Sequence, residues 1–326
     1  MFAARRKIFA GKTKICTTPL LVPSFSSKGF PEVNKIISTT SEIITGAALI
    51  SAYDLYYDMV DYEMDFPEFL FIDSGGYEAS KDTEIADLGY LDHEAKKWNR
   101  EMHSEVLANW IDRTPTVAIS YDHPKEKCSI QNQIERASDF FGTQGNNNRG
   151  KELLLKPETE NQFFINIENV IEHIPSFSEF NIIGFTEKEL GKSILDRMKN
   201  IARIRIAMNK KKIFLPLHIF GSLDTITTPL YFLSGADIFD GLTWLRLAYL
   251  NGITSYIQNY SALELGIQTK DQIAIAQTWS KNYYYLSGLE LEMKQFINEG
   301  NFDAFKFNSE LFKNSVQYLV AKLEED

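Results

Sequence analysis

The sequence predicts an α/β protein of the (β/α)8 TIM-barrel class with additional C-terminal helices. Eight short apolar segments recur along the first 240 residues with helical stretches between them, which indicates parallel βα units. Several of these segments are apolar nearly throughout, as expected for strands that are buried on both faces. A doubly wound open sheet is the alternative, since it also alternates strands with helices.

The expected elements follow from apolar runs bounded by polar or glycine-containing turns. The eight strands are expected at 18–24, 47–53, 68–73, 116–122, 162–167, 180–185, 214–220 and 235–240. Helical periodicity covers 92–110 and 186–209, and then 244–258, 270–281, 284–299 and 302–323. The Gly/Asn-rich stretch 142–151 is expected to be a surface loop. Without a repeat or an interdomain linker, residues 1–326 are assigned to one domain whose helical C-terminal part spans about 244–326.

Composition narrows the class of protein. A hydrophobic content of 44% supports a large core, and no run of 18 apolar residues is present to span a membrane. Cys16 and Cys128 lie far apart and form no CxxC pair, which fits a reducing compartment, so a cytoplasmic location is expected. The net charge of −10 argues against a general binder of polyanions.

Basic residues are nevertheless concentrated between 192 and 212, where eight lysines and arginines accompany a single acid, Asp196. A solvated helix face is one interpretation. The other is a local patch that contacts nucleic-acid phosphates, with Lys210, Lys211 and Lys212 as the candidate contacts.

Three acids occupy similar positions in the expected barrel. Asp73, Asp122 and Asp240 each end an apolar strand. The carboxyl ends of parallel barrel strands open on one face, where active sites of this fold are built. Aspartate also ends strands as a turn former or helix cap, but three converging carboxylates repel one another and indicate function.

The string DSGGY at 73–77 adds a binding feature to these acids. Paired glycines let a backbone approach a ligand closely, and Tyr77 beyond them can stack on a flat ring. Phe220 ends the apolar run 215–220 and could face Tyr77. An aromatic pair of this kind suits a nucleobase.

With these strings the chain resembles the tRNA-guanine transglycosylases, (β/α)8 barrels that exchange guanine for a 7-deazaguanine base. The resemblance rests on five strings that run in family order over most of the chain. They are DSGGY at 73–77, AISYDHP at 118–124, IIGF at 182–185, LHIFG at 217–221 and GADIFDGLTWLR at 235–246. The stretch 281–305 also resembles the closing helices of that family.

The resemblance implies a role for each matched residue. Asp240 would be the nucleophile that attacks C1′ and forms a covalent glycosyl-enzyme intermediate, and Asp73 the general acid/base. Asp122 would bind the guanine-like edge, between Tyr77 and Phe220. The other implied base-binding residues are Ser74, Gly75, Gly76, Asn166, Gly184 and Gly221, with Glu189 orienting the backbone after Gly184 and Arg246 near the nucleic-acid strand.

The sequence departs from this family in the zinc site. The family carries three closely spaced cysteines and a distant histidine after the nucleophile strand, whereas no cysteine follows Cys128 here and Lys281 stands at the histidine position. We therefore expect no zinc, no zinc subdomain and no other cofactor. A zinc-less barrel looks more like the related DNA-guanine transglycosylases, so DNA is the favoured polymer and tRNA the alternative. The incoming base would be a free 7-deazaguanine such as preQ0 or preQ1.

Two other function classes remain open at this stage. A non-catalytic subunit that binds nucleic acid beside an active partner would have no chemical need for both Asp73 and Asp240. An O-glycoside hydrolase also uses two carboxylates on a barrel, although an aromatic slot fits a purine better than a sugar chain. A homodimer or a complex with partner proteins is compatible with either class.

Overall fold

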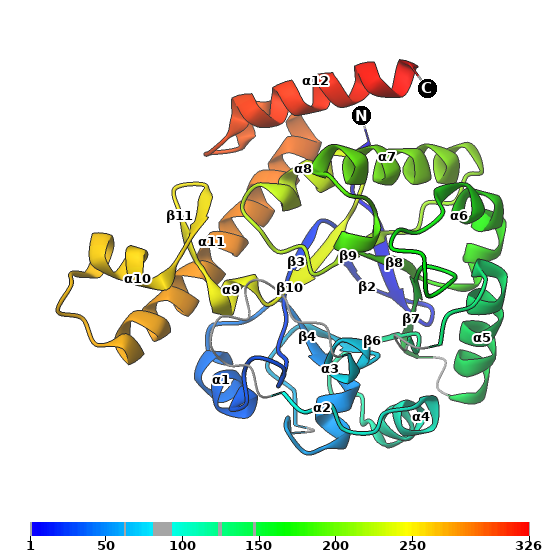
Figure 1. The fold of residues 1–326 in the computed structure, drawn as a ribbon, viewed down its shortest axis with the longest axis horizontal. Helices are drawn as coiled ribbons and strands as arrows, with labels where there is room; N and C mark the ends of the chain where they lie inside the picture. The colour runs from blue at the N-terminus through cyan, green and yellow to red at the C-terminus, as the bar shows by residue number, and fades with distance from the viewer. Residues whose placement is uncertain (1, 62, 81–92, 123–125, 146–147, 326) are drawn as a thin grey trace.

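The computed structural model describes residues 2–61, 63–80, 93–122, 126–145 and 148–325, and its centre is an eight-stranded parallel sheet that curves into a nearly closed barrel (Figure 1). The sheet order is β3-β10-β9-β8-β7-β6-β5-β4. A single parallel bridge between Ser24 and Leu49 joins its two edges. The strands are β3 (Leu20–Pro23), β4 (Ala47–Ser51), β5 (Phe69–Asp73), β6 (Thr116–Ile119), β7 (Gly150–Leu155), β8 (Ile182–Thr186), β9 (Leu217–Phe220) and β10 (Ile238–Gly241). The (β/α)8 prediction is confirmed, and the open-sheet alternative is wrong.

The fifth strand is not where the sequence predicted it. Residues 162–167 form no strand, and β7 occupies Gly150–Leu155 instead, at the end of the stretch expected to be a loop. Phe163 is 82% exposed, while Ile165 and Ile167 are buried in the core outside the sheet, so the apolar character of 162–167 comes from packing without a strand. The charged Lys151 and Glu152 concealed the true strand, because Glu152 is buried inside the barrel.

A hairpin that the sequence did not predict closes the amino-terminal end of the barrel. It pairs β1 (Lys7–Ala10) with β2 (Thr13–Thr17) in antiparallel fashion. Ile8 is fully buried and packs in the barrel interior with Val117, Phe71 and other inward-facing side chains. The hairpin therefore fills the end of the barrel opposite the carboxyl ends of its strands.

Helices surround the sheet in the expected alternation. They are α1 (Val33–Thr40), α2 (Ala52–Tyr56), α3 (Gly76–Ala79), α4 (Arg100–Asn109), α5 (Ile130–Thr143), α6 (Ile167–His173), α7 (Ile194–Lys210) and α8 (Thr227–Leu233). The helices predicted at 92–110 and 186–209 correspond to α4 and α7, which both begin later than expected. Residue 92 of the first, 123–124 of the AISYDHP string and 146–147 of the predicted loop lie outside the described residues.

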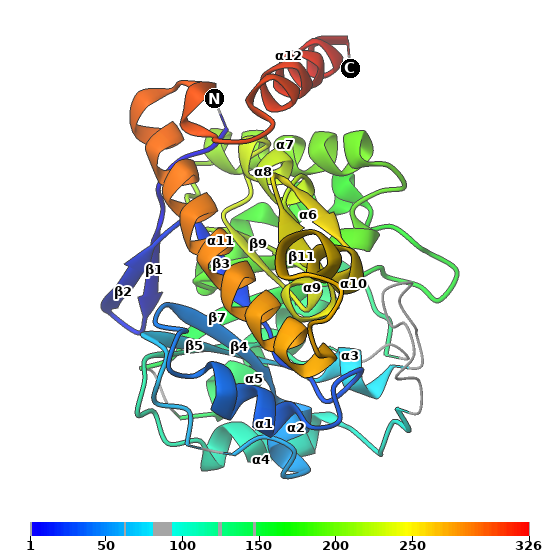
Figure 2. The same cartoon turned by 90° about the vertical axis from the view of Figure 1, so that its left-hand side faces the viewer.

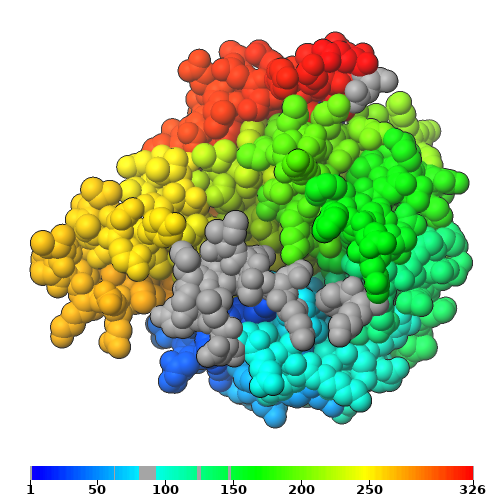
Figure 3. All heavy atoms as spheres, viewed as in Figure 1, coloured from blue at the N-terminus to red at the C-terminus, as the bar shows by residue number. Residues whose placement is uncertain are grey.

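The C-terminal part is helical, with one exception. The predicted helix 244–258 is wrong, since only α9 (Thr243–Arg246) and α10 (Ile257–Tyr260) are helical and a hairpin of β11 (Ala248–Leu250) and β12 (Ile253–Ser255) lies between them. The two helices predicted between 270 and 299 form one continuous α11 (Asp271–Glu299), and α12 (Ser309–Glu325) follows. Figure 2 shows α11 crossing the barrel wall, and Figures 1 and 3 show α12 lying over the α7–α8 side and the β11–α10 segment projecting outwards. Among the described residues, no helix has the length and apolar character needed to cross a membrane.

The barrel strands alternate between inward and outward side chains, and this alternation positions the site. Val22, Leu49, Phe71 and Ile238 face inwards and pack in an interior cluster, while their neighbours pack against the helices. Inward positions near the carboxyl ends of the strands then carry polar groups in place of apolar ones. Asp240 follows this rule, two residues after Ile238 on β10.

Candidate active site

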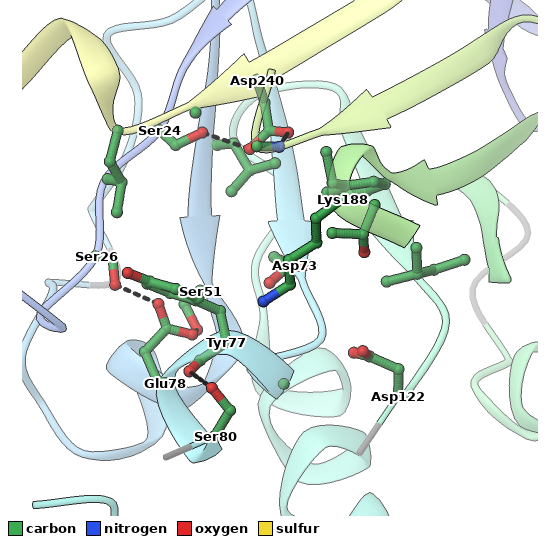
Figure 4. A pocket seen from close by; sticks show the side chains of 18 of the residues that line it. Ser24, Ser26, Ser51, Asp73, Tyr77, Glu78, Ser80, Asp122, Lys188 and Asp240 are labelled. Carbon is green, nitrogen blue, oxygen red and sulfur yellow. Dashed lines mark hydrogen bonds between the residues drawn. The ribbon is translucent and has the colours of Figure 1, made fainter. Parts of the chain in front are cut away.

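A cavity of about 370 Å³ opens at the carboxyl ends of the barrel strands, within the range of about 300–1,000 Å³ typical of small-molecule sites. Its lining includes all three predicted acids, Asp73, Asp122 and Asp240, from β5, the loop after β6 and β10. Tyr77 and Phe220 also line it. Figure 4 shows the three carboxyl groups directed into this space from different sides. The expected convergence of the acids at one mouth is thus present.

Asp240 is tightly fixed. Its Oδ2 accepts a hydrogen bond from the Ser24 hydroxyl at 2.7 Å, and its Oδ1 accepts one from the Gly221 backbone N–H at 3.1 Å. Oδ1 also lies 3.3 Å from Nε2 of His218. The side chain is mostly buried, at 6% residue exposure, yet it lines the cavity. A carboxylate with this many donors has one orientation toward a ligand.

Asp73 is in a different electrostatic position. Burial raises the pKa of Asp73 well above its usual range, and the nearby carboxylates of Asp122, Glu78 and Asp240 raise it further. A hydrogen bond from the Ser74 backbone opposes this increase in pKa without reversing it. A raised pKa suits Asp73 to hold a proton, as a general acid must.

Asp122 lies beside a lysine that the sequence analysis did not identify. The Ser74 hydroxyl donates to Asp122 Oδ1, and Lys156 Nζ lies 3.6 Å from Asp122 Oδ2. Lys156 is also 3.0 Å from Glu189 Oε2 and donates to the Thr186 hydroxyl at 2.8 Å. Burial would lower the pKa of Lys156, but the carboxylates of Glu189 and Asp122 outweigh this and raise it. One wall of the cavity thus presents a carboxylate acceptor next to a cationic donor.

Tyr77 is held by two cations. The buried Lys28 lies 4.3 Å from the centre of the Tyr77 ring and donates to the Tyr77 carbonyl at 2.9 Å. Arg246 donates to the Tyr77 hydroxyl at 2.9 Å, which brings the predicted nucleic-acid contact to the rim of the cavity. Lys127 and Lys188 also line the cavity, and Figure 4 shows Lys188 reaching towards Asp73.

A buried pair stands behind Asp240 and Phe220. His218 Nδ1 lies 2.8 Å from Glu152 Oε1, and neither side chain has exposed surface. The Phe220 ring stacks on the His218 ring with centroids 3.9 Å apart. Burial alone would lower the pKa of His218, but Glu152 and Asp240 raise it to about 9. The imidazole is therefore protonated at neutral pH and lies between two carboxylates.

Other predicted residues support the cavity from behind. Ser74 bonds Asp122, and Gly75 has the left-handed φ of +85° that lets the chain turn after β5. A Cβ on Gly76 would lie 2.5 Å from Asp122 Oδ1, and one on Gly184 would lie 2.5 Å from the Phe220 ring. These two glycines are therefore needed for the neighbouring side chains to reach their places.

Four predicted contacts lie elsewhere. Asn166 is exposed and caps α6, where its Oδ1 accepts from the backbone N–H groups of Glu168 and Asn169. It follows from the misplaced strand, so its assignment as a base contact is corrected. Lys210, Lys211 and Lys212 end α7 ahead of β9, at the amino-terminal end of the barrel and away from the cavity. Because α7 runs along the outside of the barrel away from the mouth, these three lysines are too far from the cavity to contact a nucleotide bound there.

Four residues of the site were not predicted from the sequence, and two of them were missed because the fifth strand was misplaced. Glu152 and Lys156 both belong to the β7 segment, at inward positions of the same alternation. The signal was the run KELLLK at 151–156, with three leucines between charged residues. Lys28 and Glu78 were also missed, and each is buried, with Glu78 accepting hydrogen bonds from Ser26 and Ser51.

Within the described residues, no three His, Cys, Asp or Glu side chains gather as a metal site would require. No protein-family model matches the sequence, and a search of curated proteins finds no match.

Proposed function

We propose that the chain is a base-exchange transglycosylase that replaces guanine in DNA with a 7-deazaguanine base through a covalent Asp240-glycosyl intermediate. One observation carries this proposal. Two carboxyl groups in one cavity have opposite environments, since Asp240 is fixed by several donors while the pKa of Asp73 is raised well above its usual range. Such a pair suits a nucleophile and a proton carrier for glycosidic-bond exchange.

The reaction balances with these two groups. An oxygen of Asp240 attacks C1′ of the target nucleotide, the C1′–N9 bond breaks, and its electrons pass to the departing guanine, which takes a proton from Asp73. The incoming base returns a proton to Asp73, its N9 attacks C1′, and Asp240 leaves as a carboxylate. No step consumes an oxidant, a reductant or a metal ion.

Base recognition is supported by the pair Asp122 and Lys156. A guanine edge presents two neighbouring N–H donor groups and a carbonyl acceptor, which complement a carboxylate and an ammonium group 3.6 Å apart. An adenine edge would place an amino group against Lys156 or a ring acceptor against Asp122. Tyr77 and Phe220 would bound the two faces of the base.

The cavity rim supports a nucleic-acid substrate. Arg246 and Lys127 are among the residues that line the cavity and suit contact with phosphates next to a flipped-out nucleotide. DNA is preferred over tRNA because the sequence lacks the cysteines of the zinc subdomain in the tRNA enzymes that it resembles.

The test is incorporation of radiolabelled guanine. The protein is incubated with the labelled base and, separately, with duplex DNA, single-stranded DNA and bulk tRNA, with Asp240→Asn as the matched inactive variant. We expect label in DNA, lost in the variant. Label in tRNA alone would overturn the choice of polymer, and label in no polymer would favour the non-catalytic binding subunit.

A further inference from the structure

The buried pair of His218 and Glu152 behind Asp240 takes no part in the two proposed steps of base exchange. Glu152, His218 and Asp240 form a chain of charges, with contacts of 2.8 Å and 3.3 Å, across three barrel strands. Burying a histidine between two acids is costly unless each charge is paired. A barrel that needed only packing here would have used an apolar side chain, as it does at Ile238 and Phe71.

The surroundings of His218 leave these two acids as its charged neighbours. Phe71 from β5 and Phe220 from β9 pack on its ring at centroid distances of 5.4 Å and 3.9 Å. From β8, Gly184 pairs in register with His218, and a Cβ there would meet Glu152 Oε1 at 2.8 Å. The space around the imidazole is thus closed, and its two ring nitrogens are directed at Glu152 and Asp240.

We infer that His218, oriented by Glu152, is a positioning residue that fixes Asp240 for attack on C1′ and stabilises it again when the glycosyl intermediate breaks down. This role rests on the proposed function, in which Asp240 is the nucleophile. His218 and the Gly221 N–H both hold Oδ1, while Ser24 holds Oδ2.

The charge balance explains why a cation helps both half-reactions. Burial raises the pKa of Glu152 and the contact with His218 opposes this rise, and with all three groups ionised before attack they carry two negative charges and one positive charge. In the ester intermediate Asp240 is neutral, and His218 with Glu152 forms a neutral ion pair. When the incoming base displaces Asp240, the carboxylate forms again next to a cation already in place, so little reorganisation is required.

A second buried histidine provides a matched control. His103 on α4 is also fully buried, and its ring stacks on Phe140. Neither ring nitrogen of His103 has a hydrogen-bond partner among the described residues, whereas His218 has a hydrogen bond between Nδ1 and Glu152 and an ion-pair contact, without a hydrogen bond, between Nε2 and Asp240. Burial lowers the pKa of His103 to about 3, in contrast to the value of about 9 for His218. The two histidines thus differ in their charged partners and not in burial.

The first arm of the test does not depend on activity. Histidine ring resonances are followed by NMR as a function of pH in the wild-type protein, in Asp240→Asn and in Glu152→Gln. We expect His218 to titrate at about 9 and to shift to lower pH in both variants, while His103 is unchanged. Titration of His218 at its ordinary value, or the same value in Asp240→Asn, would overturn the pairing.

The second arm measures guanine exchange. His218→Leu is expected to lower kcat on the order of 100-fold with little change in KM for guanine, because one donor to a reacting carboxylate is lost. His218→Gln, which keeps a donor, should restore part of this loss, and His103→Gln should leave kcat unchanged. Equal effects of the Leu and Gln variants, or a loss that follows the melting temperature alone, would make the role structural. Absence of exchange by the wild-type protein, with the titration intact, would overturn the proposed function and with it the catalytic role, but not the ion pairs.

Discussion

Asp237 and Asp240 lie three residues apart on the same strand segment and stand at opposite ends of the barrel. At the amino-terminal end, Asp237 bonds Arg6 and Arg205, each at 2.5 Å, and accepts the Leu217 backbone N–H at 2.8 Å. At the mouth, Asp240 accepts two neutral donors and contacts one histidine, and it faces a cavity.

The difference separates an acid that holds the fold together from one available for chemistry. Asp237 links the N-terminal segment, α7 and the barrel. Each of its two oxygens accepts a hydrogen bond from a buried arginine, so neither is available to a ligand. Burial lowers the pKa of Arg205 to about 10, still well above neutral pH, so the network stays charged. The mouth acids have fewer fixed cations, and Asp73 retains a raised pKa that a purely structural site would have no reason to keep.

Neutralising Asp240 should remove activity without unfolding the protein. Asp240→Asn is expected to reduce guanine exchange by about 10⁴-fold or more, because removal of a nucleophile leaves only binding and electrostatics. The free energy of unfolding should change little. The covalent protein–DNA adduct, measured on denaturing gels after trapping, should disappear. An active, adduct-forming variant would show that Asp240 is not the nucleophile.

Neutralising Asp237 should have the opposite pattern. Asp237→Asn leaves Arg6 and Arg205 buried with one neutral partner, and we expect a loss of about 3–5 kcal/mol in the free energy of unfolding. Denaturant titration measures this loss. The exchange rate per folded molecule should remain near the wild-type value, and a specific loss of kcat at full folding would contradict the division into structural and reactive acids.

Asp73→Asn tests the raised pKa in two ways. Loss of the proton carrier should lower kcat by about 10²–10⁴-fold, and in the wild-type protein kcat/KM should fall as pH rises through the pKa of Asp73. For stability the sign is also fixed. A folded-state pKa above the unfolded value contributes stability that is present at low pH and is lost as pH rises.

The same variant therefore should be more stable than the wild-type protein at pH 8, by about 1 kcal/mol or more for each unit of pKa, and no more stable at pH 3.5. Melting temperatures at both pH values measure this. Equal stability at pH 8 would mean that the carboxyl group carries no desolvation cost, against the burial and repulsion described above.

Most of the barrel and the three acids at its mouth could be predicted from the sequence. The apolar runs indicate the strands, and the acids that end them indicate the site. Seven of the expected strands overlap observed ones, and Asp73, Asp122 and Asp240 converge as expected. The remaining one, the expected fifth strand, failed because β7 carries Lys151 and the inward-facing Glu152 and is flanked by Arg149 and Lys156. A buried charge that is satisfied by a distant partner cannot be distinguished from a surface charge in sequence.

The same limit explains which contacts the sequence did not predict. His218 is paired with Glu152, 66 residues away, and Asp237 with Arg6, 231 residues away, and no local pattern connects such partners. The basic residues at 210–212 are evident from composition, but composition does not show at which end of the barrel the C-terminus of α7 lies. A helix that connects two parallel barrel strands runs back to their amino-terminal ends, so the C-terminus of the helix between β8 and β9 lies opposite the mouth.

Lys156 is paired more loosely than the arginines at Asp237, and its removal should weaken base binding. Asp237 has two arginines at 2.5 Å, whereas Asp122 shares one lysine with Glu189 at 3.6 Å and 3.0 Å, so a ligand can compete for that lysine. Lys156→Met keeps a long, unbranched side chain and removes the hydrogen-bond donor. We expect KM for guanine to rise about 10–100-fold, as for loss of one hydrogen bond to a charged group, while kcat changes less. Lys210→Met, at the far end of the barrel, is the matched control and should leave both constants unchanged. If Lys156→Met bound guanine as well as the wild-type protein, the lysine would be a structural partner of Glu189, and base recognition would rest on Asp122 without it.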